Sequence, residues 1–256
     1  SARQIGVRGA ALSFIDVCLL YGDTAETIYP VSRSGRFMEV KPSPQTPLPE
    51  VSPRWRQACA HIDNASELRE ILIGAAGEFG DFSTADLAAV IDGQDFTGDA
   101  VAELEASLRA AEGTGPLTPA AAVGAAFRGV FQECVDWHKA HGPMPGFREL
   151  SRTLERVAFG PPPVTAKRLL ELIHSGVVNT HYLGTPEQID SWREQGGVDL
   201  LIDATVAPQA TPSPFHDVPG VVEIGRMNEI SLPGLDSLNR SVHDDIPRWA
   251  EKVGNP

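Results

Sequence analysis

The sequence predicts an α/β protein whose parallel sheet is built from two separated segments and interrupted by an all-helical insertion. Residues 4–41 read as strand, helix and strand. Residues 53–178 show apolar residues at helical spacing, and strand-like runs return after residue 177. We therefore expect residues 1–50 and 177–256 to form the α/β part and residues 51–176 to form the helical insertion.

The first segment begins with an apolar strand from Gln4, a tight turn at Gly9 and a helix that passes Asp16. A second apolar run ends at Ser32, and a further short strand is expected over 37–40. Prolines at 42, 44, 47 and 49 then predict a stiff, extended connector.

The insertion is predicted helix by helix from caps and apolar spacing. Ser66 opens one helix, Ser83 a second, and Thr97 or Asp99 a third. The longest helix spans Thr118 to His141, with Pro119 at its first position. Two more helices are expected at about 146–157 and 164–174.

The returning segment alternates strands and helices. Strands are expected at 177–183, 198–204 and 221–225. Helices are expected at 186–195 and 238–253. This order places a second set of strands beside the first, in one sheet.

The opening strand, turn and helix have the layout of a Rossmann-like dinucleotide-binding unit, in which backbone N–H groups at the turn and helix N-terminus contact a pyrophosphate. The end of the second strand meets the adenosine ribose, where an arginine pairs with a 2′-phosphate and an acidic residue with a free hydroxyl. Arginines here favour NADPH over NADH. The expected cofactor-binding residues of this unit are Gly9, Ala10, Ala11, Leu12, Ser13, Ser32, Arg33 and Arg36.

The glycine fingerprint Gly-x-Gly-x-x-Gly/Ala is only partly present in this turn. Gly9 supplies its first position, whereas Ala11 and Phe14 occupy the other two. The alternative interpretation is a strand and helix that pack without a ligand, with both arginines as solvated surface residues.

Composition limits the partners. A formal net charge of -13 and a pI near 4.9 argue against nucleic acid and anionic membrane surfaces. The 3 cysteines lie far apart in apolar contexts, which predicts buried thiols in a reducing compartment, and no apolar run has the length of a membrane span. We expect a cytoplasmic protein. His138 and His141 lack a matching carboxylate, so no metal site is expected.

Several anchors together resemble the bacterial FAD/NAD(P)-binding flavoproteins. They are the runs 8–17, 32–35, 159–162, 169–178, 201–205, 225–229 and 236–243. The resemblance implies an oxidoreductase in which NADPH passes a hydride to a flavin, with NADP and FAD as cofactors. It also implies Thr205, Gly225, Arg226 and Glu229 as residues near the flavin.

The family's FAD-binding Gly-rich turn would precede the part seen here, so FAD binding is expected only if that N-terminal segment is present. We expect the fragment alone to be inactive, and no residue is assigned a catalytic role. Val206 stands where the family usually has glycine. The alternative is a non-catalytic nucleotide-sensing or protein-interaction module with an eroded dinucleotide fold. For either function, the expected protein partner is a second copy of the chain or the missing N-terminal portion of the same protein.

Overall fold

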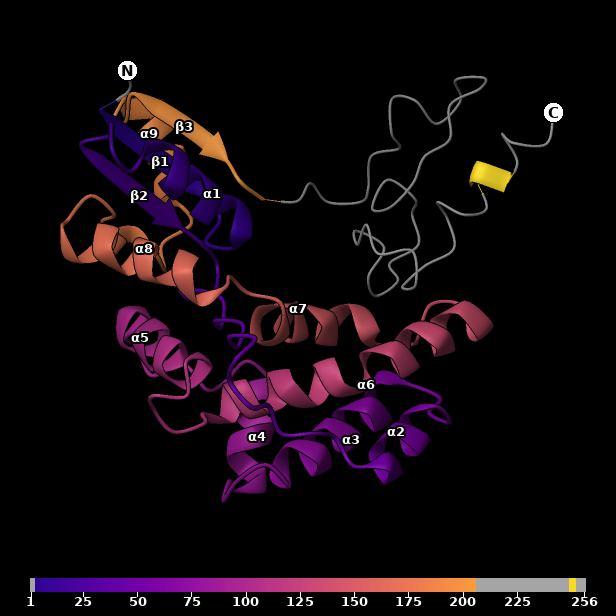
Figure 1. The fold of residues 1–256 in the computed structure, drawn as a ribbon. Helices are drawn as coiled ribbons and strands as arrows, with labels where there is room; N and C mark the ends of the chain where they lie inside the picture. The colour runs from indigo at the N-terminus through magenta and orange to yellow at the C-terminus, as the bar shows by residue number, and fades with distance from the viewer. Residues whose placement is uncertain (1–2, 206–248, 252–256) are drawn as a thin grey trace.

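A computed structural model describes residues 3–205 and 249–251. Its sheet contains β1 (Gln4–Arg8), β2 (Thr27–Val31) and β3 (Leu200–Asp203) in the order β2-β1-β3, all parallel. Val7 pairs with Pro30 on one side and with Ile202 on the other. Strands that lie almost 200 residues apart in the sequence are therefore neighbours, which confirms one sheet made from two separated segments (Figure 1).

Helices cover both faces of this small sheet because its side chains alternate. Ile5, Ile28 and Ile202 face a core shared with α1 (Leu12–Tyr21) and α8 (Pro163–His174). Tyr29 and Leu201 pack instead with Trp192 of α9 (Gln188–Gln195) on the opposite face. This is an α/β arrangement with a small parallel sheet of three strands among the described residues, which is consistent with a Rossmann-like arrangement.

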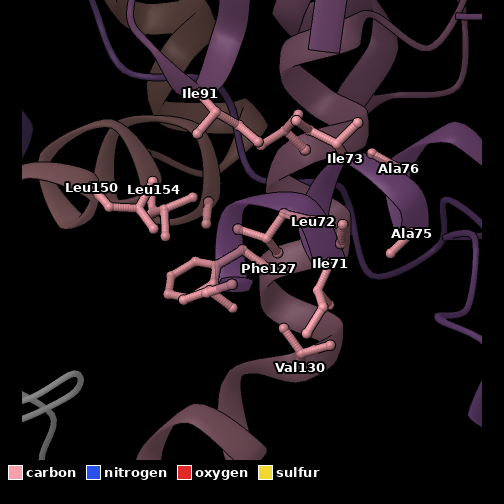
Figure 2. Packing of buried hydrophobic residues seen from close by; sticks show 14 of the residues in the cluster. Ile71, Leu72, Ile73, Ala75, Ala76, Ile91, Phe127, Val130, Leu150 and Leu154 are labelled. Atoms are coloured by element: carbon pink, nitrogen blue, oxygen red, sulfur yellow. The ribbon is translucent and has the colours of Figure 1, made fainter. Parts of the chain in front are cut away.

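A second core lies within the helical block (Figure 2). Leu72, Phe127 and Leu154 are among its buried residues. It is formed by α2 (Pro53–Cys59), α3 (Ala65–Gly77), α4 (Thr84–Ile91), α6 (Pro119–His141) and α7 (Phe147–Ala158). By contrast, α5 (Ala100–Ala111) contributes Leu104 and Leu108 to the core beneath the sheet, where it packs with α8.

Helix starts in the block follow the capping residues of the sequence. Side chains of Ser83, Asp99 and Thr118 accept backbone N–H groups at the starts of α4, α5 and α6. Asn64, rather than Ser66, caps α3. Asn64 is the better cap because its Oδ1 atom accepts two N–H groups, those of Ser66 and Glu67.

Two strand predictions are wrong. Residues 37–40 are irregular because Glu39 N–H and Val40 N–H donate to Arg156 O and Ser107 Oγ in the helical block, not to a strand. Residues 177–183 make a single bridge, between Val178 and Ile28, and then turn into the 3₁₀ helix η1 (Thr180–Tyr182).

The later elements are only partly described. The predicted strand at 221–225 lies outside the described residues, and of the predicted helix at 238–253 only 249–251 are described, as helix. Among the residues that are described, none of the helices has both the length and the apolar character needed to cross a bilayer.

Candidate functional site

The carboxyl ends of the three parallel strands meet at one edge of the sheet. From β1 the chain continues to β2 on one side, and it later returns to form β3 on the other side, so the strand order reverses at β1. Such a switch point is where open parallel sheets bind ligands. Gly9 N–H donates to Val31 O at 2.8 Å, and Ala204 N–H donates to Arg8 O at 2.8 Å, so the three chain segments leave the sheet side by side.

Gly9 gives this edge its shape. Its φ of +117° is a conformation that L side chains rarely adopt, and a Cβ there would lie 2.9 Å from Ala204 O. The turn therefore needs glycine at this position, both for its backbone conformation and for the close approach of the chain after β3.

The N-terminus of α1 opens directly from this turn. Its N-cap residue, Ala11, makes no side-chain cap, and no acidic residue stands in the first turn of the helix. Phe14, which occupies the third position of the glycine fingerprint, is wholly buried and stacks on Phe37 in the core at a centroid distance of 6.1 Å. The first-turn N–H groups thus face the edge, and no carboxylate or hydroxyl from residues 3–205 or 249–251 caps them.

The predicted residues of this turn differ in exposure. Ala10 is buried, whereas Ala11, Leu12 and Ser13 are exposed. The side chain of Ala11 is only a methyl group, so it hinders the approach of a ligand to the backbone very little. Apart from the Ser13 hydroxyl, the polar groups that Gly9, Ala11, Leu12 and Ser13 offer at this surface are therefore backbone groups.

After β2 the loop 32–36 is tightly organised. Ser32 N–H donates to Leu183 O at 2.7 Å, and Ser32 Oγ accepts Gly35 N–H at 3.1 Å. Arg33 lies at the surface, and no hydrogen bond or ion pair joins its guanidinium to another described residue. Ser32 is thus used to shape the loop, and Arg33 is the loop's available cation.

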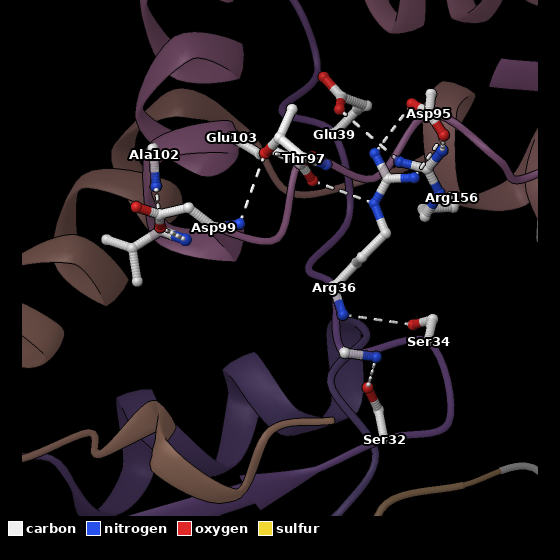
Figure 3. A network of polar contacts seen from close by, with 12 residues as sticks. Ser32, Ser34, Arg36, Glu39, Asp95, Thr97, Asp99, Ala102, Glu103 and Arg156 are labelled. Atoms are coloured by element: carbon white, nitrogen blue, oxygen red, sulfur yellow. Dashed lines mark hydrogen bonds and ion pairs between the residues drawn. The ribbon is translucent and has the colours of Figure 1, made fainter. Parts of the chain in front are cut away.

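The expected role of Arg36 as a phosphate ligand is wrong in this structure. Its side chain is 6% exposed and points into the interface between the loop and the helical block (Figure 3). Nη1 and Nη2 pair with both oxygens of Asp95, the second at 2.9 Å, and Nε donates to Glu103 Oε2 at 3.0 Å. Two carboxylates therefore satisfy the guanidinium.

Arg36 belongs to a buried ion cluster that also contains Glu39, Asp95, Glu103 and Arg156 (Figure 3). Two arginines face three carboxylates there. Burial raises the pKa of Glu39 above its ordinary value, against a hydrogen bond with Ser107 and the charge of Arg156. One Glu39 oxygen, Oε2, has no hydrogen-bond partner within the described part of the chain. No periodicity or motif in the sequence points to Asp95 or Arg156.

The end of β3 brings an acidic group to the edge that sequence reasoning missed. Asp203 accepts from Thr205, whose hydroxyl lies 2.6 Å and whose N–H lies 3.0 Å from Oδ1, and these bonds lower the pKa of Asp203. The guanidinium of Arg8 lies 3.9 Å from Asp203 Oδ2 and 3.9 Å from Asp190 Oδ1. Thr205 is thus at the predicted edge, but its hydroxyl is already engaged.

The structure does not test the remaining residues that were predicted to lie near a flavin. Gly225, Arg226 and Glu229 lie outside the described residues.

His138 and His141 each bond through Nδ1 to a carbonyl one turn earlier, at 2.7 and 2.9 Å. Within residues 3–205 and 249–251, no group of three or more metal-ligating side chains is clustered suitably for an ion.

A hollow of about 310 Å³ lies away from the sheet edge, between the proline-rich connector and the end of α5. Thr46, Glu112 and Pro163 are among its lining residues, and none of the predicted site residues that the structure describes borders it. No protein-family model matches this sequence, and no curated protein sequence is detectably similar to it.

Proposed function

We propose that the chain is the NADPH-binding unit of an oxidoreductase, with the dinucleotide seated at the carboxyl edge of the sheet. One observation carries the proposal: a glycine turn leads from the central parallel strand into a helix N-terminus that no side chain of the described residues caps, at a switch point. The first-turn N–H groups of α1 and its dipole would receive the pyrophosphate.

Arg33 would provide preference for a phosphorylated ribose. It follows β2 on a loop whose shape is fixed by Ser32, and its guanidinium makes no ion pair with a described residue. With Arg36 engaged by Asp95 and Glu103, Arg33 alone would pair with a 2′-phosphate. The chain's net charge of -13 makes such a local cation necessary for an anionic ligand.

NADPH would supply a hydride, and the resemblance to flavoproteins makes a flavin its acceptor. The part of this chain in that reaction is to bind and orient the dinucleotide. We assign no proton transfer to the edge, where the hydrogen bonds from Thr205 lower the pKa of Asp203.

Calorimetric titration of the protein with NADPH and NADH tests the proposal. We expect NADPH to bind more tightly, and Arg33→Ala to lose roughly 10-fold or more in NADPH affinity with little effect on NADH, as for one charge-assisted hydrogen bond. Arg152→Ala, which changes an exposed arginine on α7, is the matched control. Absence of binding by either dinucleotide would refute the proposal, and an unchanged Arg33→Ala affinity would refute the role of Arg33.

A second candidate is the non-catalytic interaction module. α1 exposes three leucines, Leu12, Leu19 and Leu20, at 43%, 45% and 71%. Apolar side chains gathered on one helix favour a protein contact. Light scattering of the wild type and of Leu20→Glu distinguishes this candidate: an oligomer that the substitution dissociates, in a protein that binds neither dinucleotide, supports it.

A further inference from the structure

The helical block brings two of the three cysteines together. Cys59 is the last residue of α2 and Cys134 lies within α6, and their Sγ atoms are 3.5 Å apart although 75 residues separate them in the sequence. Both side chains are wholly buried. The sequence predicted buried thiols from cysteines that lie far apart along the chain, and this pairing appears only in the fold.

Contacts on both sides of the thiols fix their approach. On α2 and α6, Arg56 Nε lies 3.9 Å from Glu133 Oε1. Beyond Cys59, the chain is held to α6 by a 2.6 Å hydrogen bond from Trp137 Nε1 to Ile62 O. Because the two elements are tied before and after the sulfur atoms, the thiols face one another in the native state.

We propose that Cys59 and Cys134 are a redox modification site, a dithiol that a low-molecular-weight disulfide converts into an intramolecular disulfide joining α2 to α6. One protein thiolate attacks the reagent, forming a mixed disulfide and releasing one thiol. The second protein thiolate then attacks the mixed disulfide and releases the second thiol. The protein loses two hydrogens and is oxidised, while the reagent is reduced to two thiols. Excess dithiol reverses the reaction.

The rate of this reaction is set by burial. The hydrogen bond to Cys59 and desolvation raise the pKa of Cys134, so thiolate is scarce at neutral pH and the reaction accelerates as pH rises. Access requires α2 to separate from the block. This helix has 7 residues, of which Pro53, Arg54, Arg56 and Gln57 are exposed, so it is a small unit to open.

Cys18 provides an internal control. It is buried between α1 and the sheet, in the other core, and burial raises its pKa to about 12. Among the described residues it has no sulfur neighbour. Of the three pairings that three cysteines allow, the fold therefore predicts one.

The test is thiol counting on the folded chain. The protein is incubated with excess glutathione disulfide at pH 8, quenched with acid, denatured and titrated for free thiols, and its tryptic peptides are mapped by mass spectrometry. We expect the count to fall from three to one, a Cys59–Cys134 cross-link, and the remaining thiol at Cys18. Cys18→Ala should give the same cross-link and no free thiol.

Cys59→Ala tests whether the cross-link needs both cysteines of the pair. In this variant Cys134 should remain a free thiol or become a glutathione adduct, and no cross-link should form. Circular dichroism shows whether each variant is folded. The proposal would be overturned if the folded chain kept three free thiols under conditions that oxidise the denatured chain, or if the wild type ended as a glutathione adduct. A disulfide that includes Cys18, or a disulfide between chains, would also overturn it.

Discussion

Replacing Arg36 by methionine tests the buried ion cluster that holds loop 32–36 against the helical block. Methionine keeps the unbranched stem of the side chain and removes the charge. Arg36 is 6% exposed in its side chain, and its partners Asp95 and Glu103 are 15% and 17% exposed. Its removal leaves three carboxylates facing Arg156 alone, in a site with little solvent to screen them.

Breaking a buried pair by removing one partner costs about 3–5 kcal/mol, since the partner stays behind as an uncompensated charge. We expect Arg36→Met to lower the free energy of unfolding by that amount. Arg69 is the matched control. It also binds both oxygens of an aspartate, Asp92, but its side chain is 28% exposed and that of Asp92 is 40% exposed, so Arg69→Met should cost no more than about 1 kcal/mol.

Urea unfolding at pH 7, followed by circular dichroism, measures both variants. The slope of free energy against urea concentration should stay that of the wild type, which shows that the same surface is exposed on unfolding. Equal losses for Arg36→Met and Arg69→Met would refute the reasoning, because burial would then make no difference to the pair.

Three further predictions concern the cluster, the turn and a cap. Burial raises the folded-state pKa of Glu39, so the contribution of Glu39 to stability is fully present below its ordinary pKa of 4.5 and is lost as pH rises through the raised pKa. The stability of Glu39→Gln should therefore increase relative to that of the wild type between pH 4 and pH 8. A stability difference that stays constant over this range would contradict the prediction. Gly9→Ala should cost at least about 1–3 kcal/mol and more than Gly142→Ala, because both glycines have positive φ but only Gly9 has a backbone oxygen within 4 Å of the added methyl. Asn64→Ala should lose about 0.5–2 kcal/mol in thermal unfolding while Asn64→Asp retains the cap, and equal losses would exclude capping as the cause.

Local signals were enough to predict most of the helical block. Pro119 and Gly142 bound the longest helix as expected, since a proline at the first position and a glycine after the end are local rules. The parallel pairing of β3 with β1 followed from the apolar runs at both ends of the chain. These features depend on neighbours in sequence or on simple patterning.

The failures arose where distant contacts decide the outcome. Residues 37–40 have strand-like composition, yet their N–H groups find partners in the helical block. Arg36 follows a strand like a phosphate-binding arginine, but Asp95 and Glu103, some 60 residues later, capture its guanidinium. Cys59 and Cys134 likewise meet only in the folded state. No spacing within the sequence carries this information.

The most direct test of the proposed edge site is hydrogen exchange measured by mass spectrometry with and without saturating NADPH. We predict slower exchange in peptides that cover residues 9–15 and 32–35, with unchanged exchange in α3 and α4 of the helical block. Slowing confined to the connector at 43–49, beside the hollow at the end of α5, or no slowing at a concentration that calorimetry shows to be saturating, would contradict the site.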